Sequence, residues 1–389
     1  MERGRYGCEK ISEENGNCLM VNSMREQIMD SHLLNQKEFN NIAEIAGNFD
    51  IGEIEEVSRY GNGRINETFL IRTLGKADTR YTRQKYILQK LHKIFKSTLL
   101  KDVDAITYHL EKNGFVTPRL IKTKDNKLGI VEKEDCWRML TYIPGISYEK
   151  GISPELAEQA AGLVGKFHDA LSNVNYAFHH KIPDFHNTPA IMNRLRRVTQ
   201  QFNASEKHKT LHPLADKILK VYERIDATLY SLPDRVIHGD LKISNVRFSK
   251  NGKEAISLLD LDTLGKGKIV IDLGDAVRSW CNSSEEGDVK GTTFNINIFE
   301  HMIRGYFQTA NFITTDEKMK IPDGIELMTL ELSARYITDA FEETYFTLDE
   351  LRYPSLYEQN KQKAIAQLQF YDDFQSKQHI VVQIIEKYA

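Results

Sequence analysis

Cysteine is scarce in this sequence, and its placement excludes two common kinds of site. The four cysteines stand at positions 8, 18, 136 and 281, with no CxxC pair and no histidine pair at metal-ligand spacing. This pattern excludes a disulfide framework and a cysteine-bound zinc site. We therefore expect free, buried thiols in a protein of the reducing cytoplasm.

The sequence also lacks long apolar runs and a large net charge. No apolar run approaches the roughly 20 residues that a membrane helix needs, and the N-terminus has no apolar segment of a secretory signal. The 52 basic and 55 acidic residues leave a net charge of −3, so electrostatics favours neither nucleic acid nor a membrane surface as a partner. Residues 1–23 are polar and aperiodic, and we expect a disordered extension or an overlong start preceding Met24.

What the sequence does contain is typical of a globular protein with two domains. Its 389 residues are 41% hydrophobic and 28% charged, which suffices for about two domains, each with a core. From about residue 50 to 142 the pattern is strand-like and is interrupted by one helix at 97–114, whereas helical patterns dominate afterwards. We predict an α+β fold with a small antiparallel β-rich lobe at 24–142 and a larger, mainly helical lobe at 143–389.

Local patterns predict the individual elements. Residues 53–60 and 67–73 alternate apolar and polar side chains around a Gly-Asn turn, which predicts a hairpin, and a third strand follows at 80–91. Ser153 and Pro154 form an N-cap and first-turn pair for the first helix of the second lobe. Further helical patterns occupy residues 189–203, 213–230, 293–311, 325–345 and 356–386.

One polar insert in the helical lobe carries most of the chemical information. Asp240 and Asn245 lie five residues apart in "VIHGDLKISNVRF" (236–248), and Asp260 ends the next apolar run. Phosphoryl transfer in protein kinases uses such a pair: the Asp accepts the proton of the substrate hydroxyl and the Asn amide binds magnesium. Magnesium prefers oxygen ligands, so Asn245 and Asp260 together predict a metal site. The structural alternative is an Asx-turn at Asp240 and a capping role for Asn245.

Four neighbouring residues permit weaker assignments. His238 has no Ser or Cys nucleophile motif beside it, so we expect a buried histidine that braces the loop rather than a general base. Lys242 is either a cation that neutralises a migrating phosphoryl group or a solvated lysine. Asp262 and Asp272 follow Asp260, and we expect one of them to hold the loop.

A glycine-rich turn in the β-rich lobe adds a second candidate. Glycine permits backbone N–H groups to approach phosphates closely, so the hairpin loop "GNGRINETF" is able to cover a nucleotide. A Gly-Asn turn is equally an ordinary hairpin connection. The candidate therefore depends on the catalytic motif in the other lobe.

Together these stretches resemble a known family. "VIHGDLKISNVRF" followed by "ISLLDLDTLGKGKIVIDLGDAVRSW" is similar to the catalytic core of the aminoglycoside phosphotransferase and choline kinase superfamily, whose members share a protein-kinase-like two-lobed fold. Four more stretches resemble its N-acetylhexosamine 1-kinase group, which phosphorylates the anomeric hydroxyl of N-acetylglucosamine and N-acetylgalactosamine: "EIEEVSRYGNGRINETFLI", "YILQKLHKIFK", "IPDFHNTP" and "LMTLELSARYITDAFEETYF". The similarity extends from about residue 45 to 375.

The resemblance implies roles for particular residues. Asp240 takes the place of the catalytic base, with Lys242 beside it, Asn245 and Asp260 as ligands of Mg²⁺, and ATP as co-substrate. The nucleotide loop would comprise Gly61, Asn62, Gly63 and Asn66, and the adenine-contacting connector Thr141, Tyr142 and Ile143. One departure concerns the phosphate-pairing lysine of many relatives, because Gln89 stands in register with it and Lys90 lies beside it.

Two stretches of the helical lobe concentrate side chains suited to sugar hydroxyls. "IPDFHNTP" offers Asp184, His186 and Asn187 on a segment bounded by prolines, where helix packing does not occupy side chains. "SARYITDAFEETY" places Arg335 and Asp339 four apart on one helical face, with Tyr345 near its end. The alternative is that Arg335 and Asp339 simply form an i,i+4 ion pair.

These observations predict an ATP- and Mg-dependent kinase of an N-acetylhexosamine. A second hypothesis keeps the fold and changes the acceptor to another hexose, an aminoglycoside, choline or another small alcohol. A third is a nucleotide-binding pseudokinase, against which the presence of Asp240, Asn245 and Asp260 argues. The sequence does not indicate the oligomeric state.

Overall fold

The computed structural model describes most of the chain, namely residues 35–61, 65–74 and 83–389. The extension predicted at residues 1–23 and two residues of the predicted nucleotide loop, Asn62 and Gly63, lie outside the described residues. Within the described part, no helix is long and apolar enough to cross a membrane.

The chain divides into two compact units. They comprise Met1–Lys93 with Ile121–Tyr142, and Ile94–Leu120 with Ile143–Ala389. Among the described cysteines, Cys136 lies in the first unit and Cys281 in the second, and both are free and buried as the sequence predicts. Burial raises the pKa of both thiols, because the thiolate would lose its hydration.

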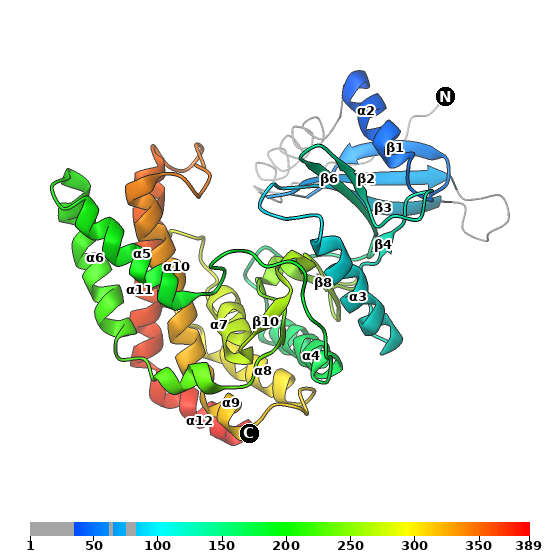
Figure 1. Ribbon diagram of the computed structural model, residues 1–389. Helices are drawn as coiled ribbons and strands as arrows, with labels where there is room; N and C mark the ends of the chain where they lie inside the picture. Colours follow the sequence, from blue (N-terminus) through cyan, green and yellow to red (C-terminus); the bar gives the residue numbers. More distant parts are fainter. Residues whose placement is uncertain (1–34, 62–64, 75–82) are drawn as a thin grey trace, which may run out of the picture. The chain divides into compact units, whose positions relative to one another are not determined.

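The first unit is built on an antiparallel sheet (Figure 1). Its strands are β1 (Ile54–Arg59), β2 (Glu67–Leu74), β3 (Arg83–Leu91), β4 (Leu120–Ile121), β5 (Ile130–Glu132) and β6 (Asp135–Thr141). Strands β1, β2, β3 and β6 are neighbours in this order, each antiparallel to the next. The predicted hairpin and third strand are confirmed, because alternating side chains suit a sheet with one face on the core.

The core of this unit forms between the sheet and one helix, α2 (Gln36–Ala46). Ile42 and Ala46 of α2 contact a cluster from the strands and the loop before them: Phe49, Val57, Phe69, Ile71, Leu88, Trp137 and Met139. The helix begins with a capping box in which Asn35 and Glu38 bind each other's backbone N–H groups. This helix was not predicted from the sequence.

Helix α3 (Leu99–Lys112) belongs to the second unit, although the sequence groups it with the strands around it. Its apolar face explains the difference, because Ile106 and Leu110 join the core of the helical unit. The buried carboxylate of Asp102 also accepts hydrogen bonds from the backbone N–H groups of His179 and His180. The helix itself is confirmed at the predicted place.

The second unit is mainly helical. Its helices are α4 (Pro154–Leu171), α5 (Thr188–Gln201), α6 (Glu206–Tyr222), α7 (Ile269–Trp280), α8 (Ile296–Phe307), α9 (Thr315–Met319), α10 (Ile321–Glu342), α11 (Leu356–Ser376) and α12 (Gln378–Tyr388). Short strands pair antiparallel as β7 (Arg235–Ile237) with β10 (Gly265–Gly267) and β8 (Val246–Phe248) with β9 (Ala255–Leu258). Three 3₁₀ turns complete it, η1 (Ala227–Ser231), η2 (Ile243–Asn245) and η3 (Leu261–Thr263).

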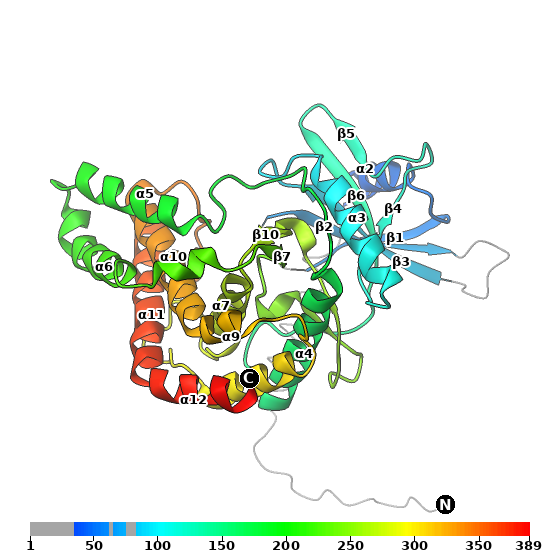
Figure 2. The same ribbon diagram turned by 60° about the horizontal axis from the view of Figure 1, so that its bottom comes forward.

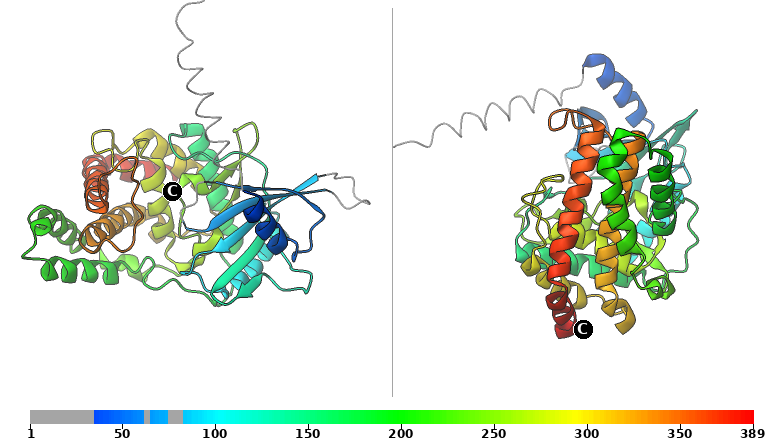
Figure 3. Two further views of the ribbon diagram at one scale, coloured as in Figure 1. Left: turned by 90° about the horizontal axis from the view of Figure 1, so that it is seen from above. Right: turned by 90° about the vertical axis from the view of Figure 1, so that its left-hand side faces the viewer.

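Helix α10 lies at the centre of the second unit (Figures 1 and 3). It packs against α5, α6, α7 and α11, and for this reason it is buried on nearly all sides. Figure 2 shows α12 and α4 near α8, which packs against both. Two carboxylates of α10, Glu331 and Asp339, are buried within this packing.

Most helices of the second unit occur where the sequence predicts them, but the short helix α9 was not predicted and three further corrections are needed. Helix α6 begins at Glu206, not at residue 213, because Ser205 caps it and Pro213 is tolerated inside it. The pattern at 356–386 is broken at Lys377 into α11 and α12. Helix α7 was not predicted, and nearly all of its residues are buried in the structure.

Candidate active site

The predicted catalytic loop follows β7 and is held by a buried carboxylate. Asp272, on α7, accepts hydrogen bonds from the backbone N–H groups of His238 at 2.7 Å and Gly239 at 2.8 Å. It also binds Nε2 of His168 at 3.0 Å. Burial opposes the charge of Asp272, but these partners lower its pKa below the ordinary value. Of the two acids considered, Asp272 thus holds the loop.

His238 braces the loop from inside. Its Nε2 donates to the carbonyl of Leu259 at 2.9 Å, and its Nδ1 accepts from the backbone N–H of Asp240 at 3.3 Å. Burial lowers the pKa of His238, which favours this neutral tautomer. The side chain is buried, so the expectation of a bracing histidine is confirmed.

Gly239 occupies a position that other residues fit poorly. Its φ of +83° lies in the left-handed region, and a Cβ there would come within 2.6 Å of the carbonyl oxygen of Thr263. Since Thr263 also donates to the carbonyl of His238 at 2.8 Å, the backbone is closely packed on this side. The loop therefore presents Asp240 from a tightly fixed backbone.

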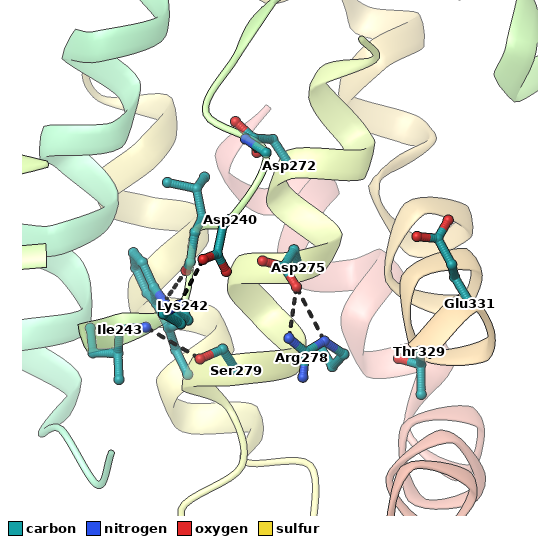
Figure 4. Close-up of polar contacts among 12 residues, drawn as sticks. Asp240, Lys242, Ile243, Asp272, Asp275, Arg278, Ser279, Thr329 and Glu331 are labelled. Atoms are coloured by element: carbon teal, nitrogen blue, oxygen red, sulfur yellow. Dashed lines mark hydrogen bonds and ion pairs between the residues drawn. The ribbon is translucent and has the colours of Figure 1, made fainter. Parts of the chain in front are cut away.

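The Asp240 carboxylate is oriented by two donors (Figure 4). Its Oδ2 accepts from Nζ of Lys242 at 2.7 Å and from Nδ2 of Asn245 at 3.1 Å. Burial would raise the pKa of Asp240, but the charge and hydrogen bond of Lys242 outweigh it, so this pKa lies below the ordinary value. Asp240 is therefore an ionised, oriented hydrogen-bond acceptor, and Lys242 is paired with it rather than solvated alone.

Asn245 and Asp260 provide oxygen ligands close to this carboxylate. Both amide contacts of Asn245 use its nitrogen, which donates to the Asp240 backbone carbonyl at 2.8 Å and to its side chain. The amide oxygen is thus turned away from Asp240. Asp260 has φ +60° and ψ +59°, a conformation that is costly for a residue with a Cβ and clusters at functional sites. Within the described residues no three His, Cys, Asp or Glu side chains form a metal cluster, so a cation here would need the amide and further oxygens from its ligand.

A second acid–base pair lies beside the loop, on α7. Asp275 accepts from Nη2 of Arg278 at 2.7 Å and from its Nε at 3.2 Å. Figure 4 shows this pair beside Asp240 and Lys242. The negative charges of Asp240, Asp260 and Asp275 together raise the pKa of Lys242. Ser279, on the same helix, accepts from the backbone N–H of Ile243 at 3.2 Å. The sequence signal was weak: two charges three apart in the apolar segment "IVIDLGDAVRSW".

The candidate nucleotide residues have defined places in the described part of the chain. Gly61 has a φ of +74°, as a tight turn requires, and the side chain of Asn66 accepts from the backbone N–H of His92 at 2.9 Å. Thr141 ends β6, and the ring of Tyr142 meets that of Tyr60 edge-on at 6.0 Å. Ile143 begins the next segment, where its carbonyl accepts from Nε of Arg247 at 3.0 Å.

The predicted acceptor residues line a cavity of about 510 Å³ in the helical unit. Its wall combines the loop 182–186 with one face each of α5 and α10. Four of the five predicted residues contribute to it, namely Asp184, His186, Arg335 and Tyr345. The fifth, Asn187, instead caps α5 by accepting from the backbone N–H of Ala190. Asn187 is thus not among the residues that line the cavity, and this position does not support its predicted contact with the substrate.

Arg335 and Asp339 do not form the ion pair considered as an alternative. Arg335 donates from Nη2 to the hydroxyl of Tyr345 at 2.7 Å and lies over that ring at 5.1 Å. Asp339 accepts from three successive backbone N–H groups, at residues 344–346, and from Nδ2 of Asn360. Asp339 therefore closes the turn after α10, whereas Arg335 and Tyr345 form a joined pair on the cavity wall.

Asp184 and His186 stand on a strained segment. Their φ angles are +54° and +51°, in the left-handed region that non-glycine residues rarely adopt. His186 donates from both ring nitrogens, to Glu331 and to the carbonyl of Gly239. Neither nitrogen is therefore available to the substrate that receives the phosphoryl group. Both ring nitrogens are therefore used within the protein, the ring itself lines the cavity, and a contact of His186 with the substrate stays a prediction.

Comparisons with known proteins decide the family. Residues 56–294, more than half of the chain, match the phosphotransferase enzyme family, APH. The chain belongs to this family. Three solved structures have a similar fold: an aminoglycoside phosphotransferase from Alicyclobacillus acidocaldarius, amicoumacin kinase hAmiN in complex with AMP-PNP, Ca²⁺ and Ami, and a choline kinase from Cryptosporidium parvum.

These similarities are structural rather than close in sequence. The TM-scores are 0.57, 0.58 and 0.56, at identities of 15%, 14% and 13%. The alignments cover 90%, 84% and 89% of this chain and 97%, 92% and 97% of the other chains. The predicted fold class is thus confirmed: the phosphotransferase has the α+β, protein-kinase-like fold, with an antiparallel-sheet lobe and a helical lobe.

The phosphotransferase has a buried arginine in its sheet. Gln89 of β3 accepts from Nε and Nη2 of Arg138 at 3.0 and 2.8 Å, and Arg138 is the strand partner directly opposite it on β6. Arg138 is almost completely buried. Lys90 points elsewhere and pairs with Asp135 at 2.8 Å. The buried cation beside Gln89 is therefore supplied by β6, which sequence comparison at β3 alone was unable to reveal.

Proposed function

We propose that this phosphotransferase is an ATP- and Mg-dependent kinase that transfers the γ-phosphoryl group to the anomeric hydroxyl of an N-acetylhexosamine. The product would be the sugar 1-phosphate. The observation that carries the proposal is that Lys242 and Asn245 both donate hydrogen bonds to one carboxylate oxygen of Asp240. Membership of the phosphotransferase family supports the reaction class.

The catalytic loop suits phosphoryl transfer because that reaction depends on positioning and charge more than on a strong base. Asp240, ionised and held by two donors, would accept a hydrogen bond from the attacking hydroxyl and take its proton as the bond to phosphorus forms. Lys242, whose ammonium donates to Asp240 at 2.7 Å, would balance charge on the transferred group.

Asn245 and Asp260 would hold Mg²⁺. Their oxygens fit the preference of this ion for hard ligands, and the nitrogen contacts of Asn245 leave its amide oxygen for that purpose. When bound with ATP, the ion would neutralise charge on the phosphates. We propose that Gly61, Asn62, Gly63 and Asn66 contact the nucleotide phosphates and that the connector Thr141, Tyr142 and Ile143 contacts the base.

The charges of the cavity favour a neutral, hydroxyl-rich acceptor over a cationic one. Three of its four acidic residues are engaged by the protein: Glu331 by His186, Asp339 by backbone N–H groups, and Glu342 by Arg194, whereas Asp184 accepts one hydrogen bond from Asn187. Among the described residues, Arg197 and Arg335 of the same wall form no salt bridge with a carboxylate. A polycationic aminoglycoside or choline would therefore meet few carboxylates able to offset its charge.

Arg335, Tyr345 and Asp184 are the groups that we propose contact the sugar. Arg335 and the Tyr345 hydroxyl offer hydrogen-bond donors. The Asp184 carboxylate offers acceptor oxygens, one of which accepts from Nδ2 of Asn187 at 3.3 Å. Such a mixed set matches vicinal hydroxyls and an acetamido group. The similar structures include an aminoglycoside phosphotransferase and a choline kinase, so these acceptor classes remain the second candidate function.

A comparison of acceptors tests the proposal. Purified enzyme with ATP and Mg²⁺ is offered N-acetylglucosamine, N-acetylgalactosamine, glucose, galactose, choline and kanamycin, and phosphorylated products are identified by ³¹P NMR. We expect an anomeric phosphate on an N-acetylhexosamine with the highest kcat/KM, formed at least ~10²-fold more slowly by the Asp240→Asn control. Preferential phosphorylation of choline or kanamycin would replace the proposed acceptor. ATP binding without transfer to any acceptor would favour a pseudokinase.

A further inference from the structure

His186 is held between two hydrogen-bond acceptors. Its Nε2 lies 2.8 Å from the carbonyl oxygen of Gly239, and its Nδ1 lies 2.9 Å from Oε1 of Glu331. A peptide carbonyl is only able to accept, so Nε2 must carry a proton. An ionised Glu331 also only accepts, so Nδ1 must carry one as well. The geometry therefore requires either an imidazolium beside a carboxylate or a neutral pair.

Electrostatics selects the charged pair. Glu331 is 1% exposed and its second oxygen accepts from the hydroxyl of Thr188 at 2.6 Å. Burial opposes both charges, but the contacts with Glu331 raise the pKa of His186 to about 9, and those with His186 lower the pKa of Glu331. Asp275 on α7 further favours the imidazolium, and Arg335 on α10 further favours the carboxylate.

The pair acts on the peptide unit that leads into Asp240. Asp272 holds the N–H of Gly239, His186 holds its carbonyl, and His238 accepts from the N–H of Asp240. The carbonyl and this last N–H belong to one planar peptide. Its orientation is thus fixed from both edges. The same His186 ring lines the acceptor cavity.

We propose that His186 and Glu331 form a charged strut between α10 and the catalytic loop, and that both are positioning residues for phosphoryl transfer. The strut rests on the proposed function only in that Asp240 is the group it positions. It also joins the wall of the acceptor cavity to the backbone of the base. Loss of the strut is therefore expected to lower kcat more than it weakens ATP binding.

The charge state is tested without any activity. In uniformly ¹⁵N-labelled protein, we expect one histidine ring to remain an imidazolium up to about pH 9, with both ring nitrogens bearing protons. That signal should be missing in His186→Gln and should titrate at least one pH unit lower in Glu331→Gln. A neutral His186 at pH 7 in the wild-type protein would overturn the strut, whether or not an acceptor has been found.

Kinetics test the positioning role. His186→Gln should lower kcat about tenfold or more, the scale of a lost charge-assisted hydrogen bond, with the KM for ATP unchanged. Wild-type kcat should fall as pH rises through about 9, because deprotonation leaves the Nδ1 lone pair facing the Glu331 carboxylate. Glu331→Gln should lower kcat severalfold at pH 7.5 and remove this alkaline fall, since a glutamine amide is able to donate to neutral His186.

A matched control is available in the same unit. His301 on α8 also pairs with a glutamate, Glu158 of α4, at 3.0 Å. His301→Gln should leave kcat and its pH profile at the wild-type values. Wild-type kinetics in His186→Gln, or an unchanged alkaline fall in Glu331→Gln, would contradict the positioning role. If no acceptor in the comparison is phosphorylated, the proposed function fails, whereas the strut is still decided by the NMR titration.

Discussion

The catalytic loop and the acceptor cavity lie in the same unit but are built in opposite ways. The loop draws its polar groups from one short segment, residues 238–245, together with Asp260 and Asp272, and nearly all of them bind one another. The cavity combines residues 182–197 with residues 331–345, which begin 134 positions after the first segment ends. Local sequence thus encodes the chemistry, whereas the choice of acceptor depends on how distant segments pack.

The two regions also differ in how their charges are used. In the loop, carboxylates are ionised and oriented by lysine, histidine and amide donors. In the cavity, three of the carboxylates are already bound by other groups of the protein. Two arginines of the cavity wall, Arg197 and Arg335, form no salt bridge with a described carboxylate. Variants of the loop should therefore change catalysis or folding, and variants of the cavity should change acceptor binding.

The largest effect is expected at the buried anchor of the loop. Asp272→Ala leaves two backbone N–H groups and His168 without their shared acceptor, so the free energy of unfolding should fall by about 3–5 kcal/mol. Urea denaturation followed by circular dichroism measures it. The exposed pair of Glu206 and Lys209 provides a control, since Glu206→Ala should change stability by less than about 0.5 kcal/mol. Equal stability of the two variants would show that Asp272 does not anchor the loop.

Replacement of the proposed base should act on turnover alone. Asp240→Asn keeps the shape of the side chain but removes its charge, so kcat should fall at least ~10²-fold. Calorimetric titration with an ATP analogue should give an affinity close to that of the wild type, because Asp240 is oriented by Lys242 and Asn245 and does not hold the loop. Turnover at the wild-type rate would remove Asp240 from the role of base.

The proposed metal ligands should respond to magnesium concentration. Asn245→Ala and Asp260→Ala each remove one oxygen ligand, so the Mg²⁺ concentration for half-maximal activity should rise about tenfold. Activity measured against free Mg²⁺ at saturating ATP checks this. Ser257→Ala, in the neighbouring strand β9, is the control and should leave the magnesium dependence as in the wild type. Unchanged magnesium dependence in both ligand variants would place the cation elsewhere.

In the cavity, a smaller and more selective effect is expected. Arg335→Ala removes the guanidinium that binds the Tyr345 hydroxyl, and the KM for the acceptor should rise about tenfold while the KM for ATP stays constant. Arg196→Ala is the matched control, because Arg196 of α5 pairs with Glu223 and does not line the cavity. If Arg335→Ala merely lowered the melting temperature, Arg335 would be a structural residue.

The last difference concerns stability against pH, where one region should lose stability in alkali and the other in acid. His186 has a folded pKa of about 9 against roughly 6.5 when unfolded, so its contribution is complete below pH 6.5 and is lost as pH rises through 9. The lowered pKa of Asp272 makes its contribution complete above its unfolded pKa of about 3.9 and lost in acid. Unfolding by urea between about pH 2 and 10 should show both losses, and His186→Gln should weaken only the alkaline one. An unchanged alkaline loss in that variant would assign it to another group.

The sequence was informative where the functional residues lie close together in the chain. Asp240, Asn245 and Lys242 occupy one loop, so spacing alone was enough to predict that they would meet. Arg335 and Tyr345 were found through their polarity near the end of one helix, and the structure joins them directly. The fold class followed from the change between strand-like and helical patterns.

The remainder depends on tertiary packing. Glu331 looked like an ordinary charge in a helix, and only the left-handed backbone at His186 brings the imidazole to it from 145 residues away. Asp339 is four residues from Arg335, but the turn after α10 presents three N–H groups that bind it more completely. Neither outcome is encoded by helical spacing, because each depends on where another segment returns.

The two buried cysteines give this protein a built-in pair of reporters. Cys136 and Cys281 lie in different units, and a thiol reacts with a maleimide or disulfide reagent only when it becomes exposed as a thiolate. The labelling rate of each residue, followed by peptide mass spectrometry, thus measures how often its own unit opens under native conditions. Adding nucleotide or acceptor during labelling would reveal which unit each ligand stabilises, without any engineered probe.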